Sequence, residues 1–148
     1  MTRLLITLCF ISAIYEELKL MRQVAMATRR ILIVDDDADI REATQLCLEI
    51  MGEWEVLKAS NGQDGIAIAQ LEKPDAILLD MMLPGMDGIT ILKKLRENLE
   101  TRGIPIVILT AKAQASERKT FNRLEVAAVI TKPYDPLTIS DQITAALI

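Results

Sequence analysis

Short apolar runs alternate along the chain with longer segments in which apolar residues recur every three or four positions. The runs occupy residues 31–34, 54–58, 75–80, 104–109 and 126–131, and the longer segments occupy residues 40–51, 62–72, 89–99, 114–123 and 135–147. Short apolar runs are typical of buried strands, and the three-to-four spacing is typical of helices with one buried face. The pattern therefore predicts five strands alternating with five helices.

Specific residues mark the ends of several predicted helices. Gly52 ends the first helix, Asn61 and Gly62 belong to the turn before the second, and Pro136 lies in the first turn of the last helix. The spacing places the following residues on buried helix faces: Ile40, Ala43, Leu46, Cys47, Ile50 and Met51 in the first helix, Ile66, Ala69 and Leu71 in the second, Ile89, Leu92, Leu95 and Leu99 in the third, and Leu137, Ile139, Ile143 and Leu147 in the last.

Alternating strands and helices form a parallel sheet with helices on both faces, because right-handed crossovers connect the strands. The predicted fold class is therefore α/β, with a doubly wound five-stranded parallel sheet. The strand at residues 54–58 is short and mixed, so we expect it at an edge of the sheet. All strands point the same way, and the residues that follow them meet at one rim, where such proteins usually place their sites.

Residues 1–28 do not continue this pattern. Residues 4–14 are mostly apolar, but this stretch is shorter than the roughly 20 residues that a helix needs to span a bilayer. No convincing signal-peptide cleavage site follows it. Since Met26 resembles a natural start, we expect residues 1–28 to be a disordered extension or a misassigned start, with an amphipathic or membrane-touching arm as the alternative. Residues 29–148 are expected to form one domain.

The composition narrows the functions open to this chain. It has 148 residues, a formal charge of -4 and no histidine. The acidic charge disfavours nucleic-acid binding, so we expect no direct DNA contact; no membrane association is expected either. The lack of histidine excludes a Ser-His-Asp triad and histidine-ligated zinc. Cys9 and Cys47 have no metal-binding or redox spacing, which favours a reduced, cytoplasmic compartment.

Polar side chains follow four of the predicted strands. They are Asp35, Asp36 and Asp37 after the first strand, Asp80 at the end of the third, Thr110 after the fourth and Lys132 after the fifth. Carboxylates that share one rim repel each other and therefore favour a bound cation. Mg²⁺ prefers carboxylate and phosphate oxygens as ligands. The sequence predicts a magnesium site at this rim.

The same residues have the chemistry that phosphoryl transfer requires. Asp80 offers a carboxylate nucleophile, while Lys132 and Thr110 offer a cation and a hydroxyl group for phosphoryl oxygens. Each residue alone also has an ordinary structural interpretation: residues 35–37 favour a helix N-terminus, Thr110 bonds the backbone, and Lys132 is solvated. Their joint placement at four strand ends favours the phosphoacceptor interpretation.

Four segments carry a resemblance to a known family: ILIVDDDADI, DAILLDMMLPGMDG, VILTA and ITKPYDP. Their order and spacing are similar to those of response regulator receiver domains, the phosphoacceptor modules of two-component systems. The resemblance covers about residues 30–147 and implies a flavodoxin-like (βα)5 fold with strand order 2-1-3-4-5. No output-domain pattern follows, so we expect a stand-alone receiver that signals through protein contacts or a phosphorelay.

The resemblance also implies a metal site and a modified residue. Asp80 would accept the phosphoryl group. Mg²⁺ would be bound by Asp36, by Asp35 directly or through water, by Asp80, and by the backbone carbonyl of Met82. In this family the only chemistry expected of the chain is its own phosphorylation and dephosphorylation, so we do not expect an enzyme.

Further implications concern the phosphoryl group and the partners. Thr110 and Lys132 would hold the phosphoryl group, and a cis peptide bond would precede Pro133. The donor would be a sensor histidine kinase or a histidine phosphotransfer protein, and the downstream partner would be another protein. These partners place the protein in the cytoplasm.

Two features depart from the usual receiver sequence. Val129 occupies the position, three residues before Lys132, where an aromatic residue usually swings inward on activation. We therefore expect the signal to be carried by the loop after Thr110 and the helix at residues 114–123 alone. Met82 and Lys112 occupy positions that influence how water reaches the acyl phosphate, and the apolar Met82 predicts slow self-hydrolysis.

Three other functions remain as alternatives. A haloacid-dehalogenase-type phosphatase would use Asp35 and Asp37, but it leaves Asp80 without a role. A flavodoxin-like flavin module would need a first loop rich in Ser, Thr and Gly, whereas this loop is acidic. A pseudo-receiver would have the fold without phosphorylation and would serve as a docking module.

Overall fold

The computed structural model describes residues 2–25, 29–111 and 115–147. Five parallel strands form one sheet with the order β2-β1-β3-β4-β5. The strands are β1 (Arg30–Val34), β2 (Glu55–Ala59), β3 (Ala76–Asp80), β4 (Ile106–Thr110) and β5 (Ala128–Thr131). The predicted fold class, strand order and edge position of the second strand are confirmed.

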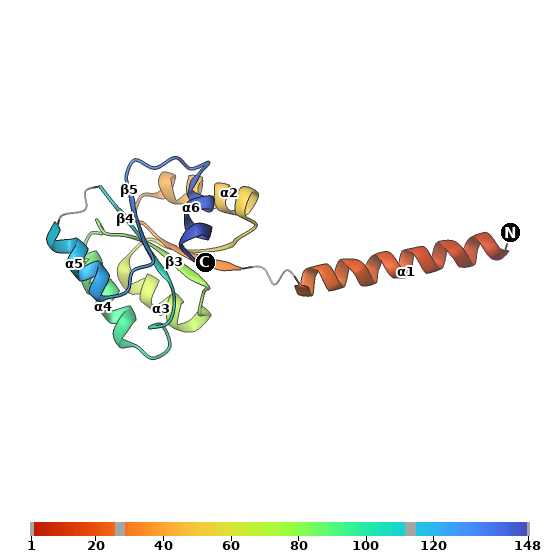
Figure 1. The fold of residues 1–148 in the computed structure, drawn as a ribbon, viewed down its shortest axis with the longest axis horizontal. Helices are drawn as coiled ribbons and strands as arrows, with labels where there is room; N and C mark the ends of the chain where they lie inside the picture. The colour runs from red at the N-terminus through yellow and green to blue at the C-terminus, as the bar shows by residue number, and fades with distance from the viewer. Residues whose placement is uncertain (1, 26–28, 112–114, 148) are drawn as a thin grey trace.

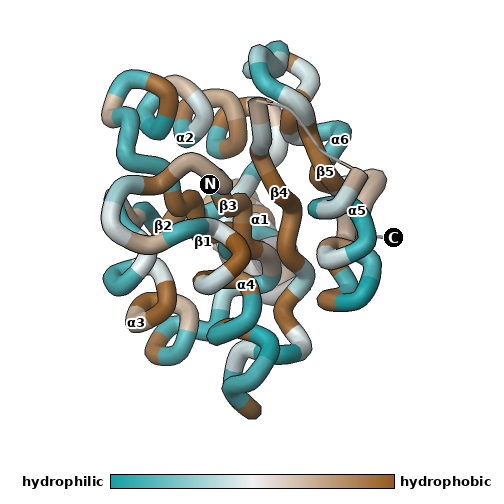
Figure 2. Tube along the Cα trace, turned by 90° about the vertical axis from the view of Figure 1, so that its left-hand side faces the viewer, coloured by the Kyte–Doolittle hydropathy of each residue, from teal (hydrophilic) through white to brown (hydrophobic). Residues whose placement is uncertain are grey.

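The helices of the domain cover both faces of this sheet. They are α2 (Ala38–Gly52), α3 (Gly62–Glu72), α4 (Gly88–Glu97), α5 (Ala115–Arg123) and α6 (Ile139–Ala146). In Figure 1, α2 and α6 lie on one side of the sheet, and α3, α4 and α5 lie on the other. Figure 2 shows the hydrophobic strands at the centre with more hydrophilic helices around them.

Alternate strand residues fill two separate cores, because successive side chains of a strand point to opposite faces. On β1, Leu32 and Val34 join the core under α3, α4 and α5, whereas Ile31 and Ile33 join the core under α2 and α6. β3 is buried along its whole length, as expected of a central parallel strand. This burial explains why the strands read as continuous apolar runs.

Two strands begin later than the sequence predicts. The strand expected from residue 104 begins at Ile106, after Pro105, which has no N–H group to donate to a neighbouring strand. The strand expected from residue 126 begins at Ala128. Val126 instead donates its backbone N–H to Phe121 O, in a turn where Glu125 has a φ of 54°. The apolar residues before both strands therefore belong to turns.

The buried face of α2 differs from the predicted one. Leu46, Ile50 and Met51 are 56%, 76% and 56% exposed, while Thr44 and Leu48 are buried. The apolar spacing fitted the predicted face, but a buried hydroxyl group is tolerated when it has a hydrogen-bond partner. Thr44 has such a partner in Tyr134, and this bond was not visible in the sequence.

Three other leucines predicted to be buried are exposed, and one of them, Leu71 near the end of α3, is 81% exposed. α4 ends at Glu97, so Leu99 lies in the following turn. α6 begins at Ile139 with Thr138 as its N-cap residue, so Leu137 and Pro136 precede the helix. The Asp135 side chain accepts a hydrogen bond from the Leu137 N–H, which forms a separate turn. Ile139 and Ile143 are buried as predicted.

The N-terminal extension contains a helix, α1 (Thr2–Ala25). This span has no glycine or proline and is rich in good helix formers. In Figure 1, α1 lies apart from the sheet and its helices. None of the helices in the described ranges is both long and apolar enough to cross a membrane. The boundary at residue 28 and the misassigned start stay predictions.

Candidate functional site

Parallel strands bring the predicted site residues to one rim of the sheet. Asp35 follows β1, which is the direct neighbour of β3. Asp80 ends β3 and is paired in register with Leu109, so Thr110 lies one residue further along β4. Thr110 is paired in register with Thr131, so Lys132 comes one residue beyond that pair. The predicted meeting of these residues is therefore a consequence of strand register.

Asp80 is the central carboxylate of this rim and is 2% exposed. Its Oδ1 accepts a hydrogen bond from the Met82 N–H at 3.0 Å. Its Oδ2 accepts a hydrogen bond from Lys132 Nζ, also at 3.0 Å. Asp80 is thus held from its own loop on one side and from the end of β5 on the other.

The loop that follows Asp80 packs closely against the start of α4. A Cβ atom added to Gly88 would lie 2.8 Å from the Cα atom of Met81. Only glycine therefore permits this approach without a shift of the backbone. Asp87 caps α4, and its Oδ1 accepts hydrogen bonds from the N–H groups of Ile89 and Thr90. Asp87 is therefore the N-cap of α4, and Gly88 is its first residue.

Asp35 is buried as deeply as Asp80 but is less completely bonded. Its Oδ1 accepts a hydrogen bond from the Asp37 N–H at 3.0 Å. Its Oδ2 is buried, has no hydrogen-bond partner among the described residues, and lies 3.7 Å from Lys132 Nζ. Burial raises the pKa of Asp35, although the Asp37 N–H and the charge of Lys132 partly oppose this. A buried carboxylate oxygen in this state fits a metal ligand.

Among residues 2–25, 29–111 and 115–147, Lys132 is the one ammonium group placed against these two carboxylates. Burial by itself lowers the pKa of Lys132. The hydrogen bond to Asp80 and the charges of Asp80 and Asp35 outweigh burial, so the pKa of Lys132 is raised. Lys132 therefore stays charged at neutral pH.

Three carboxylates at this rim are placed to share a cation. One oxygen atom from each of Asp35, Asp36 and Asp80 lies within 4.8 Å of the others. Asp36 is exposed, whereas the other two are buried. One lysine cannot neutralise three carboxylates, so the donor set fits a divalent cation with oxygen ligands. The Met82 carbonyl stays a predicted ligand.

Asp37 has a different role from its two neighbours. Its Oδ1 accepts hydrogen bonds from the N–H groups of Asp39 and Ile40, which makes it the N-cap of α2. The ordinary interpretation of the acidic run as a helix cap therefore applies to Asp37, which leaves Asp35 and Asp36 for the metal site.

Two further residues support the rim, and the sequence analysis missed both. Arg41 Nη1 donates a hydrogen bond to Asp35 O at 2.7 Å, which fixes the backbone of the acidic loop from α2. Tyr134 OH shares a hydrogen bond of 2.5 Å with Thr44 Oγ1. The position of Arg41, in the first turn of α2 and six residues after Asp35, was the only signal available.

The remaining expectations concern Pro133, Val129, Thr110 and Lys112. The peptide bond between Lys132 and Pro133 is cis, as the resemblance implied. Val129 is 38% exposed on β5, and Thr110 is 5% exposed. Lys112 lies outside the described residues.

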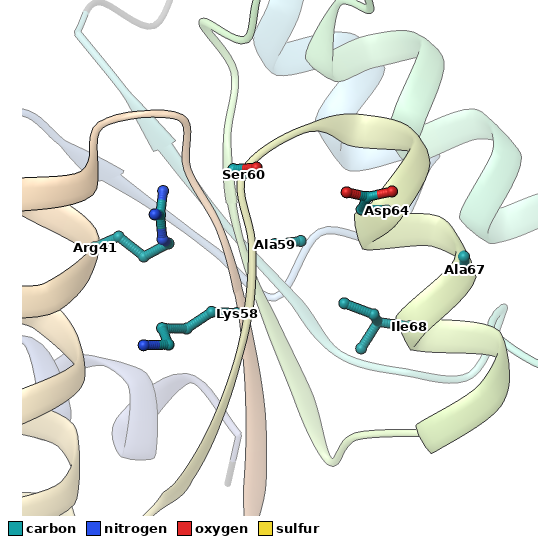
Figure 3. A pocket seen from close by; sticks show the side chains of 7 residues that line it. All are labelled: Arg41, Lys58, Ala59, Ser60, Asp64, Ala67 and Ile68. Carbon is teal, nitrogen blue, oxygen red and sulfur yellow. The ribbon is translucent and has the colours of Figure 1, made fainter.

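A groove of about 320 Å³ lies beside the rim, across β2. Figure 3 shows Arg41 and Lys58 on the α2 side of this strand, and Asp64 and Ile68 on the α3 side. The groove contains none of the three metal-site carboxylates. It is therefore separate from the candidate site.

Comparison with known proteins agrees with this geometry. The family model of the response regulator receiver domain matches residues 31–144 of this chain. PilH from Pseudomonas aeruginosa is 40% identical over 118 residues, covering 80% of this chain and 97% of PilH. The phosphate regulon transcriptional regulatory protein PhoB of the same species is 44% identical over 124 residues, covering 82% of this chain but 53% of PhoB.

Solved structures show the same fold. The chemotaxis protein CheY4 of Vibrio cholerae has a TM-score of 0.74 at 26% identity, with 80% of this chain and 98% of that chain covered. A CheY-like receiver domain protein from Methanospirillum hungatei has a TM-score of 0.74 at 31% identity, with 81% and 94% covered. The chain therefore belongs to the response regulator receiver domains, the phosphoryl-accepting modules of two-component systems.

Proposed function

We propose that Asp80 is the residue that accepts the phosphoryl group and that Mg²⁺ assists the transfer. The observation that carries this proposal is the pairing of two buried carboxylates, Asp80 and Asp35, around the ammonium group of Lys132, with Asp35 Oδ2 lacking a hydrogen bond from any residue that the structure describes. The two carboxylates carry more negative charge than the ammonium group of Lys132 neutralises. A bound divalent cation and an incoming phosphoryl group would complete the site.

The transfer itself requires little of the protein beyond a nucleophile and its alignment. An Asp80 carboxylate oxygen attacks the phosphorus atom of the donor. The new P–O bond forms as the bond from phosphorus to the donor's imidazole nitrogen breaks, and the electron pair leaves with that nitrogen. No general base is needed, because the carboxylate is already ionised. Mg²⁺, when bound by Asp35, Asp36 and Asp80, would neutralise charge on the phosphoryl oxygens.

Lys132 and Thr110 would hold the product. Lys132 Nζ is already within hydrogen-bond distance of Asp80, so a phosphoryl oxygen attached there would lie within its reach. Thr110 ends the strand next to β3, which favours a hydroxyl contact to the same group. These roles follow the usual requirement for cationic and hydroxyl donors at a phosphoryl group.

The proposed partners follow from family membership. The donor would be a sensor histidine kinase or a histidine phosphotransfer protein, and output would pass to another protein without DNA contact. The chain spans nearly all of PilH but about half of PhoB. We also propose a cytoplasmic location, supported by two cysteines that are not joined in a disulfide.

The test is intact-mass measurement of the full chain after incubation with acetyl phosphate, with and without Mg²⁺. We expect a single phosphoryl adduct that requires Mg²⁺ and is lost in Asp80→Asn. Asp75→Asn is the matched control, because Asp75 is exposed and directly precedes the same strand at the end away from Asp80. A folded protein without an adduct would instead favour a pseudo-receiver that serves as a docking module.

A further inference from the structure

The segment after β5 carries Lys132 and has little regular structure to hold it. β5 is an edge strand whose neighbour in the sheet is β4. The next helix, α6, does not begin until Ile139. The Lys132 N–H donates a hydrogen bond to Thr110 O at 2.8 Å, which fixes the backbone at the start of this segment. The course of the chain beyond Lys132, and with it the direction of the lysine side chain toward Asp80 Oδ2, depends on what fastens the following residues to the domain.

A hydrogen bond between two side chains fastens it to α2. Tyr134 lies two residues after Lys132, and its hydroxyl group shares a 2.5 Å hydrogen bond with Thr44 Oγ1. Thr44 is 1% exposed, and the Tyr134 ring packs against the core under α2 and α6. Both partners are thus held in place by their surroundings, so the bond can restrain the segment.

The position of this bond links the two halves of the phosphoryl site. α2 begins directly after the acidic loop, with Asp37 as its cap. Thr44, Lys132 and Tyr134 also line one hollow of about 480 Å³ between α2 and the segment after β5. The bond therefore connects the segment that carries the ammonium group to the helix that follows the carboxylates.

We propose that Tyr134 is a positioning residue for phosphoryl transfer, whose hydroxyl group, held by Thr44, keeps Lys132 against Asp80. The inference rests on the proposed role of Asp80. Tyr134 acts through Lys132. Its loss would let the lysine leave the position in which it meets the incoming phosphoryl group, while the three carboxylates keep their places.

The test measures phosphorylation of the full chain by acetyl phosphate in Tyr134→Phe, in Thr44→Val and in the double variant. Both single substitutions remove one hydroxyl group and keep the shape of the side chain. At saturating Mg²⁺ we expect each to slow phosphorylation by about three- to tenfold, the cost of a small misplacement. The double variant should be no slower than the single ones, because all three lack the same bond.

Three measurements separate positioning from a merely structural role. The Mg²⁺ dissociation constant, measured by calorimetry without a phosphodonor, should stay unchanged in every variant. The rates are compared well below the melting temperature of each variant, so a loss of stability alone would leave them equal. Tyr15→Phe removes the other tyrosine hydroxyl, on exposed α1, and should phosphorylate at the wild-type rate.

Two results would overturn the inference. The first is a wild-type phosphorylation rate in both Tyr134→Phe and Thr44→Val. The second is a parallel loss of Mg²⁺ affinity, which would place the effect at the carboxylates instead of Lys132. Failure of the wild-type protein to be phosphorylated at all would instead refute the role proposed for Asp80, so the two failures are distinguishable.

Discussion

Asp35 is a buried carboxylate that costs stability in the absence of a metal ion. Burial raises its pKa above the ordinary value of 3.8. For an acid whose pKa is higher in the folded state, the stability gained from protonation is complete below the unfolded-state pKa. That stability is lost as pH rises through the folded-state pKa. At neutral pH the ionised Asp35 is therefore unfavourable for folding.

We accordingly predict that Asp35→Asn stabilises the metal-free protein at pH 7 by about 1 kcal/mol, a typical size for a single substitution. The gain should shrink as pH falls toward 3.8, because wild-type Asp35 becomes protonated. Urea unfolding over this pH range provides the measurement. Asp36→Asn, at an exposed position, should give a smaller gain. A wild type at least as stable as Asp35→Asn at pH 7 would contradict the argument.

A second prediction concerns the side chain of Met82. Its side chain is 71% exposed beside Asp80 and has no group that could orient an attacking water. We expect Met82→Asn to lose its phosphoryl group faster than the wild type by about three- to tenfold, which corresponds to the roughly 0.6 to 1.4 kcal/mol that one added hydrogen bond to the attacking water contributes. Decay of the adduct after removal of the phosphodonor, followed by intact mass, gives both rates. Equal or slower decay in Met82→Asn would show that water reaches the site by another route.

Arg96 connects three backbone segments at the end of the sheet where the strands begin, opposite the candidate site. From α4, its guanidinium donates hydrogen bonds to the carbonyl oxygens of Arg102 and Ile104 in the segment before β4. It also donates to those of Leu124 and Glu125 in the turn before β5. A planar group with five N–H donors can serve four carbonyls, which a lysine cannot do.

We predict that Arg96→Lys lowers the free energy of unfolding by about 2 to 3 kcal/mol, because the part-buried hydrogen bonds to the carbonyl groups of Leu124 and Ile104 are lost together with two exposed ones. Arg118→Lys, at an exposed position of α5, should change stability by less than about 0.5 kcal/mol. Chemical denaturation of both variants compares the two arginines. Similar small losses in both would mean that water replaces the guanidinium without cost.

α5 is the element best suited to respond to phosphorylation. It buries only Phe121 among its described residues, and it follows the loop after Thr110. With Val129 in place of an aromatic residue, movement of this loop and helix is the expected route of the signal. We predict that amide exchange of α5 differs between phosphorylated and unphosphorylated protein by about threefold or more, while exchange of α4 does not. Equal α5 exchange in the two states would argue for another output surface.

At the scale of the whole molecule, the order of the strands in the sheet determines which residues meet at the candidate site. The crossover from β2 back to β3 puts β3 beside β1, so Asp35 and Asp80 become neighbours although 44 residues of chain lie between them. β4 and β5 then follow in order and bring Thr110 and Lys132 to the same rim. Two independent cores, one on each face, keep this order rigid.

Sequence reasoning succeeded where a residue's environment depends on its neighbours in the chain. The five strands are nearly continuous apolar runs because both faces of a parallel sheet are buried, so their number, type and direction could be predicted. The carboxylates, the threonine and the lysine could be assigned to one rim because the ends of parallel strands converge. The caps at Asp37 and Asp87 depend on local backbone bonds.

Only the tertiary structure decided which of several compatible arrangements each segment adopts. α2 buries Thr44 and exposes Leu46, Ile50 and Met51, because Tyr134, 90 residues away, bonds the Thr44 hydroxyl. Arg96 and Arg41 likewise bond carbonyls that no spacing rule connects to them. Composition and periodicity thus determined that this chain forms a doubly wound sheet with an acidic rim. Hydrogen bonds between distant segments determined how the rim is braced, because such bonds depend on geometry that exists only after folding.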